Sequence, residues 1–185
     1  MKPARQRSDR LSTTVYNYQE NIMTNQTNNT NHINHINQTN HTNHINHINK
    51  TAIITGASRG IGAAIAKKLA SCGYNLSLCC RNSSDRLKAL ADELHCAYGI
   101  EVLCYTGNVG DFFFAKDMVA NTISHFGHID VLINNAGISH IGLLSDMTPE
   151  EWNNIVAINL TGVFNFTKLV IPYMAVSYTH LTLPT

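Results

Sequence analysis

The stretch that decides the fold runs from Lys50 to Ala63 and reads K-T-A-I-I-T-G-A-S-R-G-I-G-A. Residues 51–55 form a short apolar run with β-branched side chains, which is typical of a buried strand. Three glycines follow, and after them apolar residues recur at the spacing of one helix face, with Lys67 and Lys68 between them. The stretch therefore predicts a strand, a glycine-rich turn and a helix.

The three glycines, spaced G-x-x-x-G-x-G, each have a physical reason to be glycine. Gly56 permits the sharp turn off the strand, Gly60 lets the backbone approach a pyrophosphate, and Gly62 lets the helix pack closely on the sheet. The N–H groups at the helix start, at the positive end of the helix dipole, would hold the phosphates. The alternative is a turn that needs glycine for its geometry alone.

The rest of the chain alternates between strand and helix patterns. We expect strands over residues 75–80, 101–105 and 129–133, and helices over residues 85–98, 111–126 and 148–174. Such alternation predicts a parallel sheet with right-handed crossovers. The expected fold class is α/β, the N-terminal half of a doubly wound Rossmann fold with strand order 3-2-1-4, truncated before the fifth strand.

Apolar spacing indicates which helical side chains face the core. The predicted inward residues are Leu87, Leu90, Leu94 and Tyr98 in the second helix and Met118, Val119, Ile123 and Phe126 in the third. The last helix opens with T-P-E-E (residues 148–151), a capping box with proline at the first helical position. Without a fifth strand, residues 131–133 are expected to form an unpaired apolar edge. The last helix is then expected to expose Trp152, Ile155, Val163, Phe164 and Phe166.

Four motifs, taken in order, resemble the short-chain dehydrogenase/reductase family. The octet T-G-A-S-R-G-I-G is similar to its nucleotide loop, and Asn108-Val109 follows the third strand, where the family places a residue pair beside the adenine. The run N-N-A-G (residues 134–137) is similar to the segment that stabilises the family's sheet and lies along its cofactor. Asn159, in I-N-L-T-G, matches the asparagine of the family's Asn-Ser-Tyr-Lys tetrad, which holds a helix irregularity and a water.

The resemblance implies a nicotinamide dinucleotide site and one residue of a catalytic tetrad. The catalytic candidate is Asn159, whose family role is to support the catalytic lysine through a water. No metal site is implied. The cofactor-binding candidates are Gly56, Ala57, Ser58, Arg59, Gly60, Ile61, Gly62, Arg81, Asn108, Val109, Asn135, Ala136 and Gly137.

Charge at the end of the second strand bears on the choice of cofactor. NAD sites usually place an Asp or Glu there, where it takes the ribose hydroxyl. Here the strand ends in Cys80-Arg81-Asn82, with no carboxylate, and Arg59 lies inside the glycine loop. Two guanidinium groups would suit a 2′-phosphate, so we expect NADP(H) rather than NAD(H). The alternative is that both arginines are solvated surface residues.

The family's reacting residues are a serine after the fifth strand and a Tyr-x-x-x-Lys pair, and this chain contains no Tyr-x-x-x-Lys. In the intact relative, hydride would pass from NADPH to a carbonyl carbon while the tyrosine protonates the oxygen. The resemblance therefore implies an NADP-dependent carbonyl reductase or alcohol dehydrogenase, and the chain as given is expected to be inactive.

The resemblance leaves the substrate open. The glycine octet and the form N-V-x-D resemble the 3-oxoacyl-[acyl-carrier-protein] reductase branch, which implies a small-molecule or carrier-bound carbonyl substrate and a place in fatty acid biosynthesis. The stretch N-N-A-G-I-S-H-I-G-L-L-S-D-M-T-P-E-E-W-N also resembles the reductase of 5-aminopentanone-modified elongation factor P. A non-catalytic nucleotide-binding module and a chain that forms no stable protein are the alternatives from other classes. The intact form is expected to be a homo-oligomer.

Composition and charge limit the classes of partner and the compartment that we expect. A net charge of +1 and a pI near 7.7 favour neither nucleic acid nor an anionic membrane. No apolar run is expected to approach the roughly 18–20 residues of a membrane helix, and no signal peptide is expected. The five cysteines lack paired metal spacing and are expected to be small buried hydrophobes in a reducing cytosol, which predicts a cytoplasmic protein.

Three parts are expected along the chain, with residues 50–175 as the partial NAD(P)-binding Rossmann domain. In residues 1–49, asparagine recurs at every third position from Asn25 to Asn49, which suits neither helix nor strand and predicts a disordered Asn/His-rich segment. Alternatives are adventitious metal binding by its histidines and translation of a tandem repeat upstream of the true start. Residues 176–185 resemble the translation of a widely used transposase sequencing adapter, so we expect a non-native tail.

Overall fold

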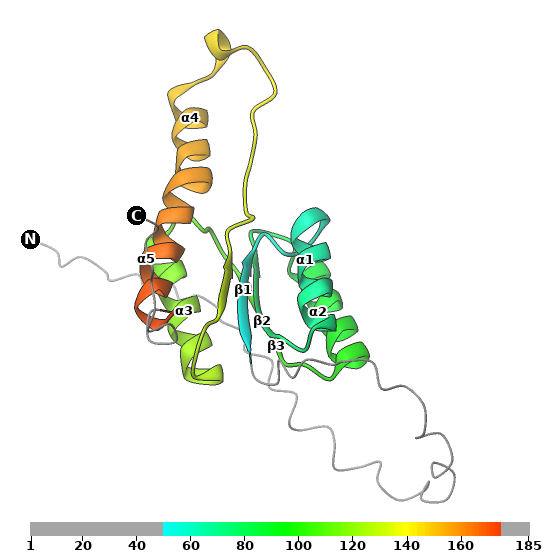
Figure 1. Ribbon diagram of the computed structural model, residues 1–185. Helices are drawn as coiled ribbons and strands as arrows, with labels where there is room; N and C mark the ends of the chain where they lie inside the picture. The colour runs from blue at the N-terminus through cyan, green and yellow to red at the C-terminus, as the bar shows by residue number, and fades with distance from the viewer. Residues whose placement is uncertain (1–49, 175–185) are drawn as a thin grey trace, which may run out of the picture.

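Four strands alternate with helices along the chain (Figure 1). The computed structural model describes residues 50–174, so the predictions for residues 1–49 and 176–185 lie outside the described residues. The elements are β1 (Thr51–Thr55), α1 (Gly60–Ser71), β2 (Asn75–Cys80), α2 (Ser84–Tyr98), β3 (Val102–Thr106), α3 (Phe112–Phe126), β4 (Val131–Ile133), a 3₁₀ turn (Leu144–Asp146), α4 (Pro149–Val156), a π-helical segment (Ala157–Thr161) and α5 (Gly162–Met174).

The strands form one parallel sheet in the order β3-β2-β1-β4, which confirms the predicted topology. In the centre, Ile53 of β1 lies opposite Ser77 of β2 and Leu132 of β4. β1 and β2 have the predicted bounds, whereas β3 and β4 begin later than predicted, at Val102 and Val131. The central strands are thus the ones that the apolar pattern located best.

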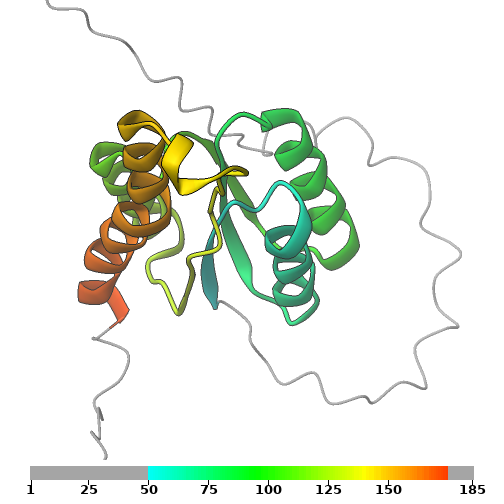
Figure 2. The same ribbon diagram turned by 90° about the horizontal axis from the view of Figure 1, so that it is seen from above.

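Helices cover both faces of the sheet, with α1 and α2 on one face and α3 and α5 on the other (Figures 1 and 2). Successive residues of β1 therefore enter different cores. Ile54 packs with Leu87 beneath α1 and α2, while Ile53 packs with Met118 and Phe166 beneath α3 and α5. This burial on both faces explains why β1 reads as a continuous apolar run rather than an alternating one.

Two side chains of α2 differ from the prediction. Leu87, Leu90 and Leu94 are buried as predicted, but Tyr98 is 48% exposed. Tyr98 is the last residue of α2, and the left-handed conformation of the following glycine turns the chain away there, so the tyrosine ring lies beyond the core. Cys96, predicted to be buried, is also exposed on this last turn of the helix.

The predicted capping box is present at the start of α4. The Thr148 hydroxyl accepts the Glu151 N–H at 3.2 Å, and the Glu151 carboxylate accepts the Thr148 N–H at 2.9 Å. The backbone hydrogen bond from Thr148 is the main cause that lowers the pKa of Glu151. The box therefore fixes the point at which the chain enters its longest helix.

This longest helix, Pro149–Met174, has 26 residues and a mean hydropathy of 1.5 in its most apolar window. The expectation that no segment would be long and apolar enough to cross a membrane is therefore wrong for the described residues. Length and composition alone are weak evidence for a membrane span, because the core helix of a soluble protein meets the same criteria. Here Phe166 and Val170 are fully buried in the core beneath α3 and α5.

The outer face of this helix is apolar and exposed. Leu160, Phe164 and Ile171 are 66%, 56% and 55% exposed, and Trp152 is 54% exposed. Phe166, which was predicted to share this exposure, is instead fully buried, because a residue two positions on from Phe164 points about 200° around the helix. Among the described residues β4 pairs with β1 alone, so its outer edge is unpaired as predicted.

Candidate functional site

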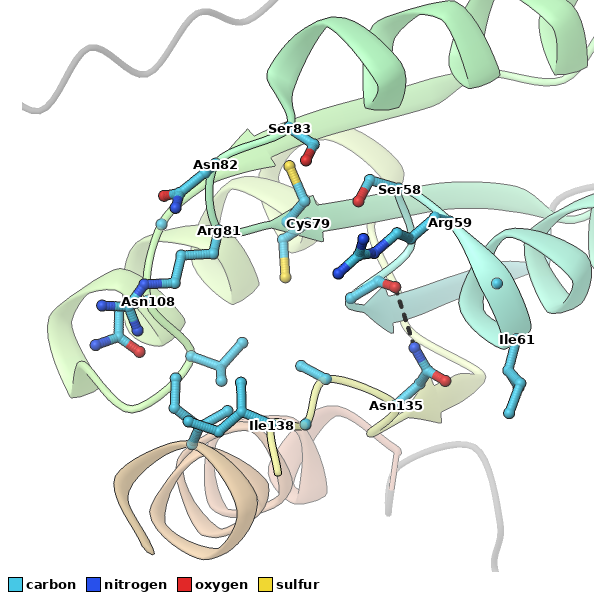
Figure 3. Close-up of a pocket in the computed structure, with 18 residues that line it drawn as sticks. Ser58, Arg59, Ile61, Cys79, Arg81, Asn82, Ser83, Asn108, Asn135 and Ile138 are labelled. Carbon is cyan, nitrogen blue, oxygen red and sulfur yellow. Dashed lines mark hydrogen bonds between the residues drawn. The ribbon is translucent and has the colours of Figure 1, made fainter. Parts of the chain in front are cut away.

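A cleft of about 490 Å³ opens at the carboxyl ends of the strands (Figure 3). Its walls come from the glycine turn after β1, the loop after β2, the turn after β3 and the segment after β4. Because the strands are parallel, their carboxyl ends meet at one edge of the sheet and bring these four connections together. The predicted residues that line the cleft are Gly56, Ser58, Arg59, Gly60, Ile61, Arg81, Asn108, Val109, Asn135, Ala136 and Gly137.

Two predicted cofactor-binding residues lie behind this lining. Ala57 is fully buried, and its N–H donates to the Cys79 carbonyl at 3.0 Å. Gly62 is buried at the start of α1, where an added Cβ would lie only 2.5 Å from both Asn135 Nδ2 and the Gly56 carbonyl oxygen. Both residues therefore shape the wall of the cleft from behind, and a side chain larger than hydrogen at Gly62 would push α1 away from it.

Gly56 and Gly60 have φ angles of 67° and 58°, a region that other L-residues rarely adopt. A Cβ on Gly56 would lie 2.9 Å from Ala136 Cα, so the turn after β1 touches the segment after β4. A Cβ on Gly60 would meet no atom within 4 Å. The conformation, rather than crowding inside the protein, therefore requires glycine at position 60, and open space for a ligand lies beside its backbone.

The start of α1 suits an anion. Arg59 is the N-cap residue, its side chain makes no capping hydrogen bond, and the first turn of α1 holds no acidic residue. The first N–H groups of a helix have no acceptor within the helix and lie at the positive end of its dipole. Because Gly60 and Ile61 line the cleft, this donor set faces it and fits the diphosphate of a dinucleotide.

Thr55 and Asn135 join the carboxyl ends of β1 and β4. The Thr55 hydroxyl accepts the N–H groups of Asn135 and Ala136, each at 3.0 Å, and donates to the Ile133 carbonyl at 3.4 Å. The Asn135 side-chain amide donates to the carbonyls of Thr55 and Gly56 at 3.0 and 3.1 Å. The segment after β4 thereby braces the glycine turn, which accords with the sheet-stabilising role that the resemblance implied.

Asn159 lies in the π-helical segment and does not line the cleft. Its Oδ1 accepts the Ile138 N–H at 2.9 Å, and its Nδ2 donates to the Ile138 carbonyl at 2.8 Å. This pairing holds the segment that carries Gly137 and Ile138 along the cleft. The π-helical segment itself is an irregularity at the position where the resemblance implied one.

The two arginines line the cleft but their side chains do not converge. Arg59 points into the cleft, whereas Arg81 extends along its wall in the direction of Asn108 (Figure 3). Both are exposed, and no Asp or Glu lines the cleft in the described part of the chain. The lining is therefore positive, with its two charges at different places along the cleft.

Sequence reasoning missed several lining residues: Cys79, Cys80, Asn82, Ser83, Gly107, Ile138 and Ile158. Most of them flank predicted residues directly, so extending each motif by one or two positions at the strand ends would have found them. Ile158 comes from the π-helical segment and had no such signal. Burial raises the pKa of the Cys79 thiol to about 12, so this thiol stays neutral at the cleft wall.

Comparison with known proteins agrees with this geometry. The family described as short chain dehydrogenase matches residues 50–179. The 3-oxoacyl-[acyl-carrier-protein] reductase FabG of Staphylococcus epidermidis is 42% identical over 125 residues, which cover 68% of this chain and 51% of that protein. The D-beta-hydroxybutyrate dehydrogenase of Cupriavidus necator is 39% identical, over 68% of this chain and 48% of that protein. The chain spans about half the length of these relatives.

A solved structure extends the comparison to three dimensions. A metagenomic short-chain oxidoreductase in complex with NADP has a TM-score of 0.67 and 34% identity to this chain, covering 70% of it and 58% of the other chain. The parallel sheet, the glycine turn and the cleft at the strand ends define a dinucleotide-binding α/β protein. Within that class, the chain belongs to the short-chain dehydrogenase/reductase family.

Proposed function

We propose that the chain carries the NADP(H)-binding half of an oxidoreductase, an NADP-dependent carbonyl reductase or alcohol dehydrogenase in its intact form. The observation that carries the proposal is the cleft, in which the uncapped start of α1, Arg59 and Arg81 surround one space without a carboxylate among the described lining residues. Backbone N–H groups at a helix start suit a diphosphate, and guanidinium groups suit a 2′-phosphate.

Each part of the cofactor has a proposed set of contacts. The N–H groups of Gly60 and Ile61 hold the diphosphate, and Arg81 binds the 2′-phosphate at the position where a carboxylate would favour NAD. Asn108 and Val109 receive the adenosine half on the side toward which Arg81 extends. The segment that contains Asn135, Ala136 and Gly137 lies along the rest of the cofactor. The NADP found in the solved relative supports this choice over NAD.

The bound cofactor supplies hydride transfer between its nicotinamide and a carbonyl carbon. The described residues bind and orient it, and Asn159 takes the place of the tetrad asparagine by fixing the backbone of Ile138. The family's proton donor is a tyrosine in a Tyr-x-x-x-Lys pair, which this sequence does not contain. We therefore propose that this chain binds cofactor without turning over substrate.

The proposed substrate of the intact protein is a 3-oxoacyl thioester or a similar ketone, small or carrier-bound, in fatty acid biosynthesis. The similarity to a 3-oxoacyl reductase and to a hydroxybutyrate dehydrogenase supports this class. The stretch after β4 keeps the reductase of 5-aminopentanone-modified elongation factor P as a second candidate. A non-catalytic nucleotide-binding module is kept as a third candidate. A cytoplasmic homo-oligomer is proposed for the intact form.

The test is cofactor binding by the 185-residue chain. We expect NADPH to bind more tightly than NADH, and Arg81→Asp to remove most of that preference. Charge-assisted hydrogen bonds of this kind contribute roughly 1–3 kcal/mol, or about 5- to 150-fold in the ratio of dissociation constants. Arg86→Asp is the matched control, because Arg86 is an exposed arginine of α2 that does not line the cleft. An unchanged preference in Arg81→Asp would remove Arg81 from the argument, and absence of NADPH binding would contradict the proposed function.

A further inference from the structure

The turn between β3 and α3 forms one wall of the cleft and has its own hydrogen bonds. The Gly107 N–H donates to the Cys80 carbonyl at 2.9 Å, which ties the turn to β2. The Gly110 N–H donates to Asn108 Oδ1 at 3.0 Å, and the Asp111 N–H donates to the Asn108 carbonyl at 2.9 Å. None of these three hydrogen bonds uses the carbonyl groups of Val109 and Gly110. Those two carbonyls therefore remain to accept hydrogen bonds from donors outside the turn.

Asn165 of α5 supplies that donor. Its Nδ2 donates to the carbonyl oxygens of Val109 and Gly110, each at 3.2 Å. The side chain is almost completely buried, with 2% of the residue exposed. A buried amide that meets two carbonyls of one turn constrains the orientation of both peptide groups, and removing it leaves the buried Val109 carbonyl without this partner.

Close packing places the same turn directly against the last helix. An added Cβ on Gly110 would lie 2.7 Å from the Ala157 carbonyl oxygen, and one on Gly162 would lie 2.8 Å from Val109 Cγ2. Such contacts set how near the turn approaches the helix, but they do not set how its peptide planes are rotated. That rotation is fixed by directional bonds on both sides of each peptide group: the N–H groups of Gly110 and Asp111 donate to Asn108, and Asn165 Nδ2 donates to the carbonyls of Val109 and Gly110. Of these donors, Asn165 is the one that lies outside the turn.

We propose that Asn165 is a positioning residue for cofactor binding, which acts through the β3–α3 turn without lining the cleft. It holds Asn108 and Val109 in the orientation that receives the adenosine half of the dinucleotide. The proposal rests on the proposed function for the identity of the ligand. The wall formed by the glycine turn has separate support from Thr55 and Asn135 and is independent of Asn165.

The test compares Asn165→Leu with Val170→Ala in the full chain. Leucine keeps the branching and the number of side-chain heavy atoms of asparagine but removes the donor. Val170 is fully buried on the same helix, and its truncation leaves a cavity without removing a hydrogen bond to the turn. The ligands are NADPH, adenosine 2′,5′-bisphosphate and reduced nicotinamide mononucleotide. Hydrogen exchange of the peptide that covers residues 107–111 is measured in parallel, with the peptide that covers residues 56–62 as reference.

In Asn165→Leu we expect the dissociation constants of NADPH and adenosine 2′,5′-bisphosphate to rise by about tenfold. Two hydrogen bonds are lost, and part of their free energy is expected to be lost from ligand binding. Exchange in residues 107–111 should rise, while exchange in residues 56–62 and binding of the nicotinamide mononucleotide stay unchanged. Val170→Ala should lower thermal stability with none of these local effects. The proposal would be overturned if Asn165→Leu, like Val170→Ala, lowered thermal stability without raising exchange in residues 107–111 or the dissociation constants of the adenosine ligands. If the parent chain binds neither adenosine ligand, the proposed function fails, and the exchange comparison still decides whether Asn165 holds the turn.

Discussion

The cleft and the outer face of the helix Pro149–Met174 differ in how many of their side chains contact other parts of the protein. In the cleft wall, Thr55 and Asn135 hydrogen-bond to one another and to neighbouring backbone at 3.0–3.4 Å. On the outer face, Leu160, Phe164 and Ile171 remain more than half exposed. The hydrogen bonds of the cleft wall need only donors and acceptors a few ångströms away, and the neighbouring ends of β1 and β4 provide them. Cover for an apolar helix face needs a second packed surface, which the described residues do not provide. The polar groups of the cleft wall can therefore be hydrogen-bonded within the described residues while the apolar face of the helix stays exposed.

The largest expected effect concerns catalysis. We expect the chain to bind NADPH but to oxidise it with a 3-oxoacyl thioester more slowly than a full-length reductase by several powers of ten. General acid catalysis by a placed side chain contributes about 10²–10⁴ by itself, and this sequence has no Tyr-x-x-x-Lys to supply it. NADPH absorbance measures the rate, with a full-length 3-oxoacyl reductase as positive control. Steady turnover by the 185-residue chain would contradict the prediction.

Two phenylalanines of α5 sharpen the contrast between core and outer face. Phe166 is fully buried beside Ile53 and Met118, so Phe166→Ala should lower the free energy of unfolding by about 3–5 kcal/mol. Phe164 is 56% exposed, so Phe164→Ala should change it by less than about 0.5–1 kcal/mol and should raise the soluble fraction by shrinking the apolar patch. Urea unfolding and sedimentation measure the two effects. Equal losses in both variants would mean that something covers the outer face.

Two threonines at opposite ends of β1 provide a second contrast, with Thr55 at the end next to the cleft and Thr51 at the other end. Thr55 accepts two backbone N–H groups of the segment after β4, so Thr55→Val should destabilise the fold by about 1–3 kcal/mol and weaken NADPH binding. Thr51 is fully buried, but its hydroxyl has no hydrogen-bond partner within the described residues, so Thr51→Val should be neutral or slightly stabilising. Thermal unfolding with and without NADPH separates these outcomes. A larger loss in Thr51→Val than in Thr55→Val would be inconsistent with this account of the wall.

The smallest expected effect comes from removing residues 1–49. The sequence of this segment offers few large apolar side chains, so it should add little to the buried area. We expect the thermal midpoint and the NADPH affinity of residues 50–185 to equal those of the full chain. One kcal/mol corresponds to roughly 2–8 °C for domains of this size range, so a drop of several degrees would be measurable. Such a drop would show that the segment packs on the domain. The exposed apolar face of α5 would then be the first surface to test for this contact.

Local patterns predicted much of the fold correctly. The apolar run 51–55, the sharp turn at Gly56 and the capping box from Thr148 to Glu151 all appear where the sequence placed them. Each depends on interactions within a few residues, such as the conformational freedom of glycine or a side chain that reaches its own helix start. The parallel sheet followed from the alternation of strands and helices, because parallel strands need crossover connections, and the strand order followed from the doubly wound fold class.

Most of the candidate site followed from the resemblance, but the support behind it did not. The sequence placed Asn108 and Val109 after β3, yet nothing near them indicated that Asn165, 56 residues further on than Val109, would donate to that turn. Cys79 is buried as predicted, but its place at the cleft wall was not predicted. These contacts join segments that are distant in sequence, so local spacing carries no signal for them.

The sequence by itself determined the strands, the glycine turn, the helix starts and the motifs of the family, because these depend on short-range chemistry. Only the tertiary structure decided that Phe166 is buried while Phe164 is exposed, and that Tyr98 lies outside the core. It also decided that Arg59 and Arg81 point to different parts of the cleft (Figure 3). The physical reason is that the burial and direction of a side chain depend on which distant segment packs against it, and that is settled only when all the layers are assembled.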